Sequence, residues 1–457
     1  MSSAAWPSRP SSSAPLARRS SCSQSSTTRP RSGPKPPEPS GRPRPPARPS
    51  LRLFGASAES GLSDAPLSRQ NGEVVIGGAS VKSWLAAIAL LAVGACASPI
   101  AAPPAEARES VSLTVGEWTQ ITAEPVMLGL ERFTPTCSDA PGADPAYSFW
   151  ARRGTGNGLV IFFDGGGACW DDLTCSVPWL ATGRTDDGFY KAEILPTDNP
   201  NRFGGIFVMN NERNPVRDWS FIYVPYCTGD VHLGSNTQTY TDVDSGEPFA
   251  IEHRGGDNFR AILQWARRNM ATPERLLVTG SSAGAYGAIG HYIRIRDAYP
   301  NASAVLLGDA GQGVTTPDFY DLRNARWGYE PPRALRGVDT DSVARLAEMY
   351  PNDRFAQFTT ANDRTQAAFY ALMGVDDACR AWREKMTRDL TARQAASNFR
   401  SYVGAGDAHT ILRAPGFYTD ASGGEPFLDW FAALVNGPGA ENRACVDCLP
   451  PPSRCGF

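Results

Sequence analysis

A Gly-x-Ser-x-Gly pentapeptide occupies residues 280–284, with Ser282 at its centre. It follows an apolar run at 276–279 and opens a segment of helical character at 283–296. Between a strand and a helix, this pattern is typical of the nucleophile elbow of serine hydrolases, where the glycines permit a tight turn. The helix N-terminus behind the serine would favour a developing negative charge. A Gly/Ser turn without a chemical role is the alternative that the pentapeptide alone leaves open.

A serine nucleophile needs a histidine base, and the chain has four candidates: His232, His253, His291 and His409. In hydrolases of the elbow type the order along the chain is serine, acid, histidine, which leaves only the last two. His291 lies about two and a half helical turns beyond Ser282 and cannot easily reach back over it. His409 follows the last expected strand in a loop of small residues, and it is therefore the expected base.

The acid that orients the base has three candidates. Asp309 and Asp363 each end an expected strand, and Asp407 lies two residues before His409. Asp407 is too near in sequence to approach the ring from the required side. The usual acid position follows the strand before the histidine strand, which favours Asp363 and leaves Asp309 as the alternative.

Backbone N–H groups must also stabilise the oxyanion that forms during attack on an ester. One donor is expected from Ala283, directly after the nucleophile, and others from a glycine-rich loop after an earlier strand. The glycine run 165–167 follows the apolar segment 159–163, which makes Gly166 and Gly167 the expected donors. No Gly-Lys-Ser/Thr follows this run, so it does not indicate a phosphate-binding loop.

From residue 159 onward, segments of strand type alternate with segments of helical type. This alternation predicts an α/β fold with a mostly parallel central sheet flanked by helices, and with its chemistry at the carboxyl ends of the strands. The segment 311–352 is longer than a simple crossover needs and is either a cap insertion over the site or a peripheral excursion. Strands are expected at 159–163, 221–226, 276–279, 304–307, 355–360 and 399–403, and helices near 258–270 and 430–435.

Composition divides the chain into four parts. Residues 1–80 are largely rich in Ser, Pro and Arg, and we expect them to be disordered or to reflect a start assigned too early. Residues 81–100 have the positive residue, short apolar core and small residues of a bacterial export signal, and Cys96 offers lipid anchoring as the alternative to ordinary cleavage. The catalytic domain is expected at 107–440 and a Cys-rich tail at 441–457.

The net charge and the small number of possible metal ligands argue against some classes of function. Residues 1–96 contain twelve Lys and Arg against four Asp and Glu, a balance of +8, so 97–457 must carry −11 to give the total of −3. Such an acidic domain has no apparent nucleic-acid footprint. Asp230 and His232, two residues apart, supply too few ligands for a zinc site. We therefore expect no nucleic-acid partner, no metal and no cofactor.

Eight cysteines follow residue 100, an even number that behind an export signal predicts up to four disulfides. Cys169 and Cys175 are close enough in sequence to bridge a small loop beside the glycine run. Cys445 and Cys448 form a Cys-x-x-Cys pair, which we interpret as a structural bridge in preference to metal or redox chemistry.

In combination these motifs resemble the pectin acetylesterase–Notum family of α/β-hydrolases, over roughly residues 112–435. The matching stretches read FFDGGGACW at 162–170 with TC at 174–175, YCTGD at 226–230, GSSAGAYG at 280–287 and DAG at 309–311.

The resemblance implies ester hydrolysis and also residue roles. It places the acid in an Asp-x-x-Gln segment, which Asp363-Arg364-Thr365-Gln366 matches, the base at His409, and the oxyanion donors at Gly166, Gly167 and Ala283. The region around His409 is leaner here than in plant and animal members, and the acyl pocket of Notum cannot be traced onto this chain. Acetyl and long acyl groups therefore both remain open.

The expected function is an exported serine carboxylic-ester hydrolase that works through an acyl-enzyme and deacetylates an acetylated glycan. A lipid, thioester or polyester esterase is the alternative, as is a non-catalytic binding protein on a hydrolase scaffold. We expect a monomer in a bacterium, located in the periplasm, outside the cell or on the cell envelope through a lipid on Cys96.

Overall fold

The computed structural model describes residues 112–180, 188–337, 342–446 and 448–452. The chain divides into two units, Met1–Pro99 and Ile100–Phe457, and all described residues belong to the second. The low-complexity segment 1–80, and the export signal expected at 81–100 with Cys96, lie outside the described residues. Among the helices of the described part, none has the length and apolar character needed to cross a membrane.

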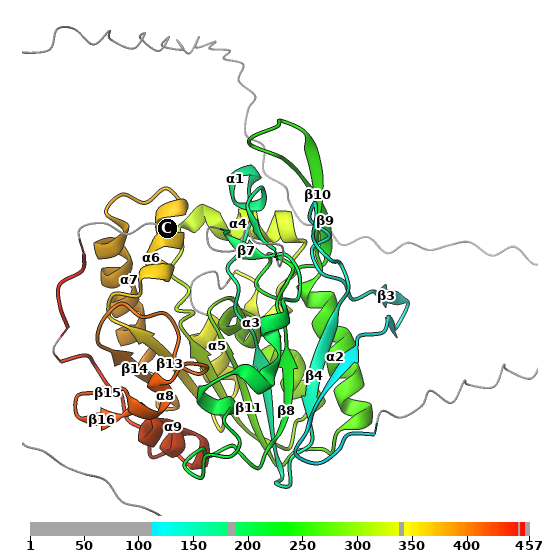
Figure 1. Ribbon diagram of the computed structural model, residues 1–457. Coiled ribbons are helices and arrows are strands. Elements are labelled where there is room, and N and C mark those ends of the chain that lie inside the picture. Colours follow the sequence, from blue (N-terminus) through cyan, green and yellow to red (C-terminus); the bar gives the residue numbers. More distant parts are fainter. Residues whose placement is uncertain (1–111, 181–187, 338–341, 447, 453–457) are drawn as a thin grey trace, which may run out of the picture. The chain divides into compact units, whose positions relative to one another are not determined.

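An eight-stranded sheet forms the centre of the second unit, in the order β1-β4-β8-β5-β11-β12-β13-β14 (Figure 1). From β8 to β14 every neighbouring pair is parallel. At the other end of the sheet, β4 pairs antiparallel with both β8 and β1. Numbered by chain position this order is 1-2-4-3-5-6-7-8, the strand order of the α/β-hydrolase fold. The strands are β1 (Trp118–Thr122), β4 (Ser148–Arg152), β5 (Gly158–Phe163), β8 (Ser220–Val224), β11 (Arg275–Ser281), β12 (Ser303–Asp309), β13 (Arg354–Thr360) and β14 (Phe399–Gly404).

Helices lie between the strands of the sheet and after the last of them. They are α1 (Asp172–Cys175), α2 (Gly255–Asn269), α3 (Ala283–Ala298), α4 (Pro317–Trp327), α5 (Ser342–Met349), α6 (Arg364–Leu372), α7 (Ala378–Arg393), α8 (Gly416–Thr419) and α9 (Phe427–Asn436). Four short antiparallel or parallel pairs accompany the main sheet: β2 (Val126–Leu128) with β3 (Glu131–Phe133), β6 (Pro178–Trp179) with β7 (Tyr190–Lys191), β9 (Asn236–Thr241) with β10 (Pro248–His253), and β15 (Ala421–Ser422) with β16 (Glu425–Pro426). Figure 1 shows the β9–β10 hairpin projecting at the top of the view.

The sheet is buried on both faces, which explains why β5 is a continuous apolar run. Leu159, Ile161 and Phe163 belong to a core cluster shared with α2, α3, α5 and α7, whereas Val160 and Phe162 belong to a second cluster shared with α9. Successive side chains of a strand point to opposite faces, so each face needs its own apolar cover.

The six strands and three helices expected from the sequence are all present, with ends that coincide or shift by up to three residues. The segment 311–352 contains α4 and α5, separated by a 3₁₀ turn at Arg333–Leu335. Beyond the expected elements, the C-terminal tail adds one bridge to the sheet edge: Arg443 pairs with Tyr402 of β14, and its N–H and carbonyl bond Ser401 and Val403.

Candidate active site

Ser282 lies in the sharp turn between β11 and α3, with backbone angles φ 58° and ψ −124°. Positive φ is rare for a residue with a side chain and is a mark of strained turns at functional sites. The turn is possible because Gly284 has no side chain: a Cβ there would lie 2.0 Å from the carbonyl oxygen of Phe163. The Ser282 N–H donates to the carbonyl of Asp309 at 2.7 Å, which ties the turn to the end of β12.

The glycine run after β5 lies directly against this turn. A Cβ on Gly165 would come within 2.9 Å of the Ser282 Cβ. Gly167 has φ 74°, and a Cβ there would meet the Phe189 carbonyl at 1.9 Å, so only glycine fits. Within the described residues, the N–H groups of Gly166, Gly167 and Ala283 have no recorded acceptor. They are therefore free to donate to a bound group.

Two disulfides hold the loops around this region. Cys169–Cys175 closes the segment after the glycine run, as expected, and Cys137–Cys227 joins two segments that are 90 residues apart. Cys445 and Cys448 form a disulfide as well, in agreement with the structural interpretation of that pair.

His409 and Asp363 meet at the carboxyl ends of β14 and β13. Nδ1–H of His409 donates to the two carboxylate oxygens of Asp363 at 2.8 and 3.0 Å. The carboxylate is fully buried and also accepts from the N–H and the side-chain amide of Gln366, at 3.0 and 2.9 Å. Asp363 thus caps α6 and fixes the ring at the same time.

The other ring nitrogen of His409, Nε2, is buried and has no hydrogen-bond partner among the described residues. With Nδ1 protonated, Nε2 carries a lone pair that can accept a proton. Burial disfavours a charge on the ring, but the nearby carboxylates of Asp363 and Asp309 outweigh it and raise the pKa of His409 above its usual value. His409 can therefore accept a proton at Nε2, and the nearby carboxylates stabilise the protonated ring.

Asp309, the alternative acid, bonds to other groups. Its buried carboxylate accepts from the Ser281 hydroxyl at 2.6 Å and from the N–H groups of Ile411 and Leu412 at 2.9 to 3.1 Å. Burial raises the pKa of Asp309 to about 6 despite these bonds. Through these hydrogen bonds, the Asp309 carboxylate links residues 411–412, which follow His409, to Ser281 at the end of β11.

Asp407, the third candidate, is exposed. It pairs at 3.2 Å with Arg364, whose side chain is also largely exposed.

A largely buried network of charged side chains lies beside the glycine run. Asp164, the residue after β5, pairs with Lys191 at 2.6 Å and with Arg413, and Lys191 also pairs with Asp198 at 2.9 Å. Burial opposes ionisation of Asp164, yet Arg413 and Lys191 hold its pKa below its usual value. The backbone N–H of Lys191 donates to the Gly166 carbonyl at 2.8 Å. The network thus joins the glycine run to the loop that carries His409.

The remaining three histidines are structural. His232, His253 and His291 are buried, and burial lowers the pKa of each: to about 4 for His232 and His253, and well below its usual value for His291. Nε2 of His232 lies 2.8 Å from the Asp164 carbonyl, and His253 bonds Tyr240 and the Thr228 carbonyl. A neutral ring in each case avoids a buried, unpaired charge.

Cys169, Cys175 and His253 come close enough together to suggest a metal site. Both sulfurs are joined in the disulfide, and both ring nitrogens of His253 have hydrogen-bond partners. This donor set therefore does not fit a metal.

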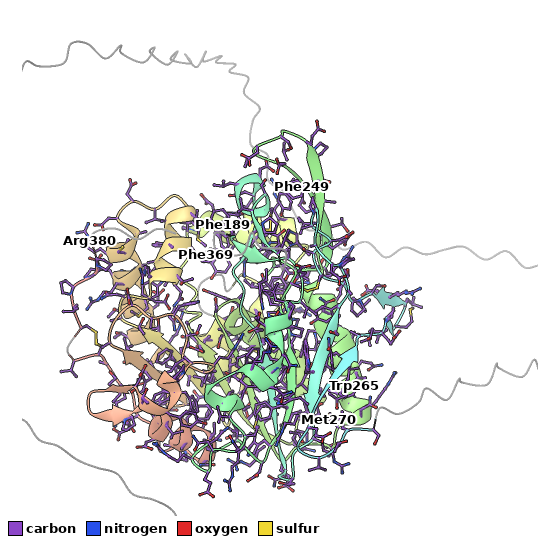
Figure 2. The ribbon with its side chains drawn as sticks, viewed as in Figure 1. Phe189, Phe249, Trp265, Met270, Phe369 and Arg380 are labelled. Atoms are coloured by element: carbon purple, nitrogen blue, oxygen red, sulfur yellow. A yellow bond between two sulfur atoms is a disulfide. The ribbon has the colours of Figure 1, made fainter. Side chains whose placement is uncertain are left out.

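Ser282 and His409 line one open cavity, which encloses about 1080 Å³ of space between atoms, its mouth included. Gly167 and Ala283 lie in the same wall, and much of the remainder is aromatic or aliphatic. Figure 2 labels Phe369 of α6, which lies 6.1 Å from Trp170, ring centre to ring centre. Further lining residues come from α3, α4, α6 and the segment 310–315.

Ser282, His409 and Asp363, the site residues expected from the sequence, all lie at the carboxyl ends of the strands. Lys191, Arg413 and the roles of Asp164 and Asp309 were not expected. An acidic residue at the end of each strand beside β11 was a signal for the last two, but the partners of those carboxylates could not be read from their positions.

The pectinacetylesterase family profile matches residues 130–354. Pectin acetylesterase 11 of Arabidopsis thaliana is 28% identical over 183 residues, which are 39% of this chain and 43% of the relative. Pectin acetylesterase 7 of the same plant is 26% identical over 230 residues, 49% of this chain and 55% of the relative. The chain thus spans about half the length of these curated relatives.

Among solved structures, the Wnt deacylase Notum from Drosophila aligns with 72% of this chain and 98% of its own, at 17% identity and a TM-score of 0.48. The glycine run, the elbow and the end of β12 all lie within residues 130–354, the region that the family profile matches. Through that region, the chain is similar to the pectinacetylesterase family.

Proposed function

We propose that the protein is a serine carboxylic-ester hydrolase that removes acetyl groups from an acetylated glycan through an acyl-enzyme. The observation that carries this proposal is the free Nε2 of His409, whose Nδ1 is fixed by Asp363 and which shares a cavity with Ser282. The glycan is suggested by the family, whose curated members include the pectin acetylesterases named above.

In the proposed reaction the Ser282 hydroxyl attacks the ester carbonyl while Nε2 of His409 takes its proton. Negative charge develops on the carbonyl oxygen, and the N–H groups of Gly166, Gly167 and Ala283 are proposed to stabilise it. His409 then gives its proton to the leaving alcohol, and the acetyl group remains on the serine. Water, deprotonated by His409, attacks this acyl-enzyme; the bond to the serine oxygen breaks, His409 returns the proton to Ser282, and acetate is released.

A second candidate is an esterase for longer acyl chains, and the composition of the cavity wall favours it. Trp170, Ile289, Phe319 and Met373 line the cavity and offer apolar contact beyond what an acetyl group needs. Transfer of each additional methylene from water into such a wall is worth about 0.8 kcal/mol. A chain that fills the cavity would therefore bind more tightly than acetyl.

The test is hydrolysis of p-nitrophenyl acetate, butyrate and palmitate by the wild type, Ser282→Ala and Ser303→Ala. Ser303, exposed at the start of β12, is the matched control and should keep full activity. We expect Ser282→Ala to lose about 10⁴-fold or more in kcat. Rates that fall steeply with chain length support deacetylation, and a preference for palmitate supports the second candidate. A folded wild type no faster than Ser282→Ala would point to a non-catalytic binding protein.

We also propose that the protein works outside the cytoplasm, because the described part contains disulfides that form in oxidising compartments.

A further inference from the structure

Arg323 of α4 lines the cavity that holds Ser282 and His409. Its guanidinium carbon lies 4.5 Å from the ring centre of Tyr320, 5.7 Å from that of Tyr329 and 5.9 Å from that of Trp327. The aromatic contacts fix its position. Its Nε is buried without a hydrogen-bond partner, and no carboxylate of the described residues forms an ion pair with it.

Several other partly buried arginines of the described part have acidic partners. Arg296 pairs with Asp353 at 2.8 Å, Arg260 with Asp257 at 3.0 Å, and Arg413 with Asp164. The Nε atoms of Arg294 and Arg354 are also buried without a partner among the described residues, but neither residue lines the cavity. A partly buried guanidinium without such a partner forgoes strong charge-assisted hydrogen bonds. Arg323 is therefore available to a group that enters the cavity.

The charge of the cavity differs from that of the domain around it. Residues 97–457 carry a net charge of −11, yet no Asp or Glu is among the described residues that line the cavity. The wall contains two arginines, and the second, Arg393, is occupied by the Gln312 carbonyl and the Gln357 side chain. A cavity of this kind attracts anions even within an acidic protein.

We propose that Arg323 binds a carboxylate on the ester substrate and so makes the enzyme selective for anionic esters. This inference depends on the proposed function. An acetyl group carries no charge, so the carboxylate belongs to the alcohol portion, as in an acetylated uronic acid. The planar guanidinium, held by three aromatic rings, offers its N–H groups to that carboxylate in a fixed direction.

The test compares two matched substrates, a monoacetate of methyl glucoside and the same monoacetate of methyl glucuronoside, which differ only in the carboxylate. Acetate release by the wild type should favour the glucuronoside by about ten- to a hundredfold in kcat/KM, mainly through KM. In Arg323→Gln this ratio should fall to near one, and Arg323→Lys should restore part of it. The matched control is Arg326→Gln on the same helix, outside the cavity wall, which should keep the wild-type ratio.

The inference is overturned if the wild type hydrolyses both monoacetates with equal efficiency. It is also overturned if Arg323→Gln slows both to the same extent, since Arg323 would then only support the wall. If the wild type hydrolyses none of the esters, including p-nitrophenyl acetate, the proposed function itself fails. Calorimetry with methyl glucuronoside and methyl glucoside then decides the role of Arg323: equal affinity of the wild type for both contradicts it, and a preference lost in Arg323→Gln supports it.

Discussion

Replacement of Lys191 by methionine is the most informative perturbation of the buried charge network. The side chain is buried and pairs with Asp164 at 2.6 Å and with Asp198 at 2.9 Å. Methionine keeps most of the volume of lysine and removes only the charge. Asp164 retains Arg413, but Asp198 loses its cationic partner. Removal of one partner from a buried ion pair costs about 3–5 kcal/mol, and we expect the free energy of unfolding to fall by that amount at pH 7.5.

The decrease in the free energy of unfolding should depend on pH, and the titration of Asp198 determines in which direction. Burial already raises the pKa of Asp198, and Lys191 opposes that shift, so the pKa rises further in Lys191→Met. In the unfolded chain the pKa of Asp198 stays at about 3.9. The folded variant therefore binds a proton more readily than the unfolded chain, and the deficit shrinks as the pH falls through the raised pKa. Each pH unit in that window recovers up to about 1.4 kcal/mol.

Urea denaturation at pH 7.5 and pH 5.5 measures both effects. The matched control is Lys385→Met, since Lys385 pairs with Asp389 at 2.7 Å on α7 where both side chains are partly exposed. That pair should contribute less than about 1 kcal/mol at either pH. A loss for Lys191→Met as small as that of the control, or equal at both pH values, would refute the reasoning.

Three further predictions concern the site. Asp363→Asn should lower kcat by about 10⁴-fold. It should also move the acidic limb of the pH–rate profile to lower pH, because burial alone lowers the pKa of His409 and the carboxylate raises it. Asp309→Ala should lower the free energy of unfolding by at least about 2 kcal/mol in urea denaturation, since it leaves buried N–H groups unpaired; full stability would contradict this. Replacement of both Cys169 and Cys175 by serine should lower kcat several-fold on p-nitrophenyl acetate with little change in KM; an unchanged kcat would show that the disulfide does not order the loop.

The sequence was sufficient to predict the parallel part of the sheet because most of those strands are largely buried on both faces. Such burial favours a continuous apolar run, as in β5, which can be recognised without a partner. β13 and β14 mix polar with apolar residues and give a weaker signal. β1 and β4 lie at the antiparallel end, where β1 is only partly buried and its residues are largely polar. No contiguous apolar run marks β1, and it was missed.

The candidate triad was predictable for a similar reason. The elbow is a local pattern, and the order of strands brings the loops after β13 and β14 toward it, so Asp363 and His409 follow from topology. The supporting charges depend on contacts between distant positions. Arg413 and Asp164 are 249 residues apart, and Asp309 and Ile411 are 102 apart. Only the folded chain shows which carboxylate meets which donor.

The bridge between Arg443 and β14 has a consequence for association between molecules. β14 is the last strand of the sheet, and the outer edge of a terminal strand can template pairing with another chain. The segment around Arg443 occupies part of that edge through two backbone hydrogen bonds. The tail therefore protects the sheet against edge-to-edge aggregation, and a chain that ends at Ala440 should aggregate faster than the intact chain at equal concentration.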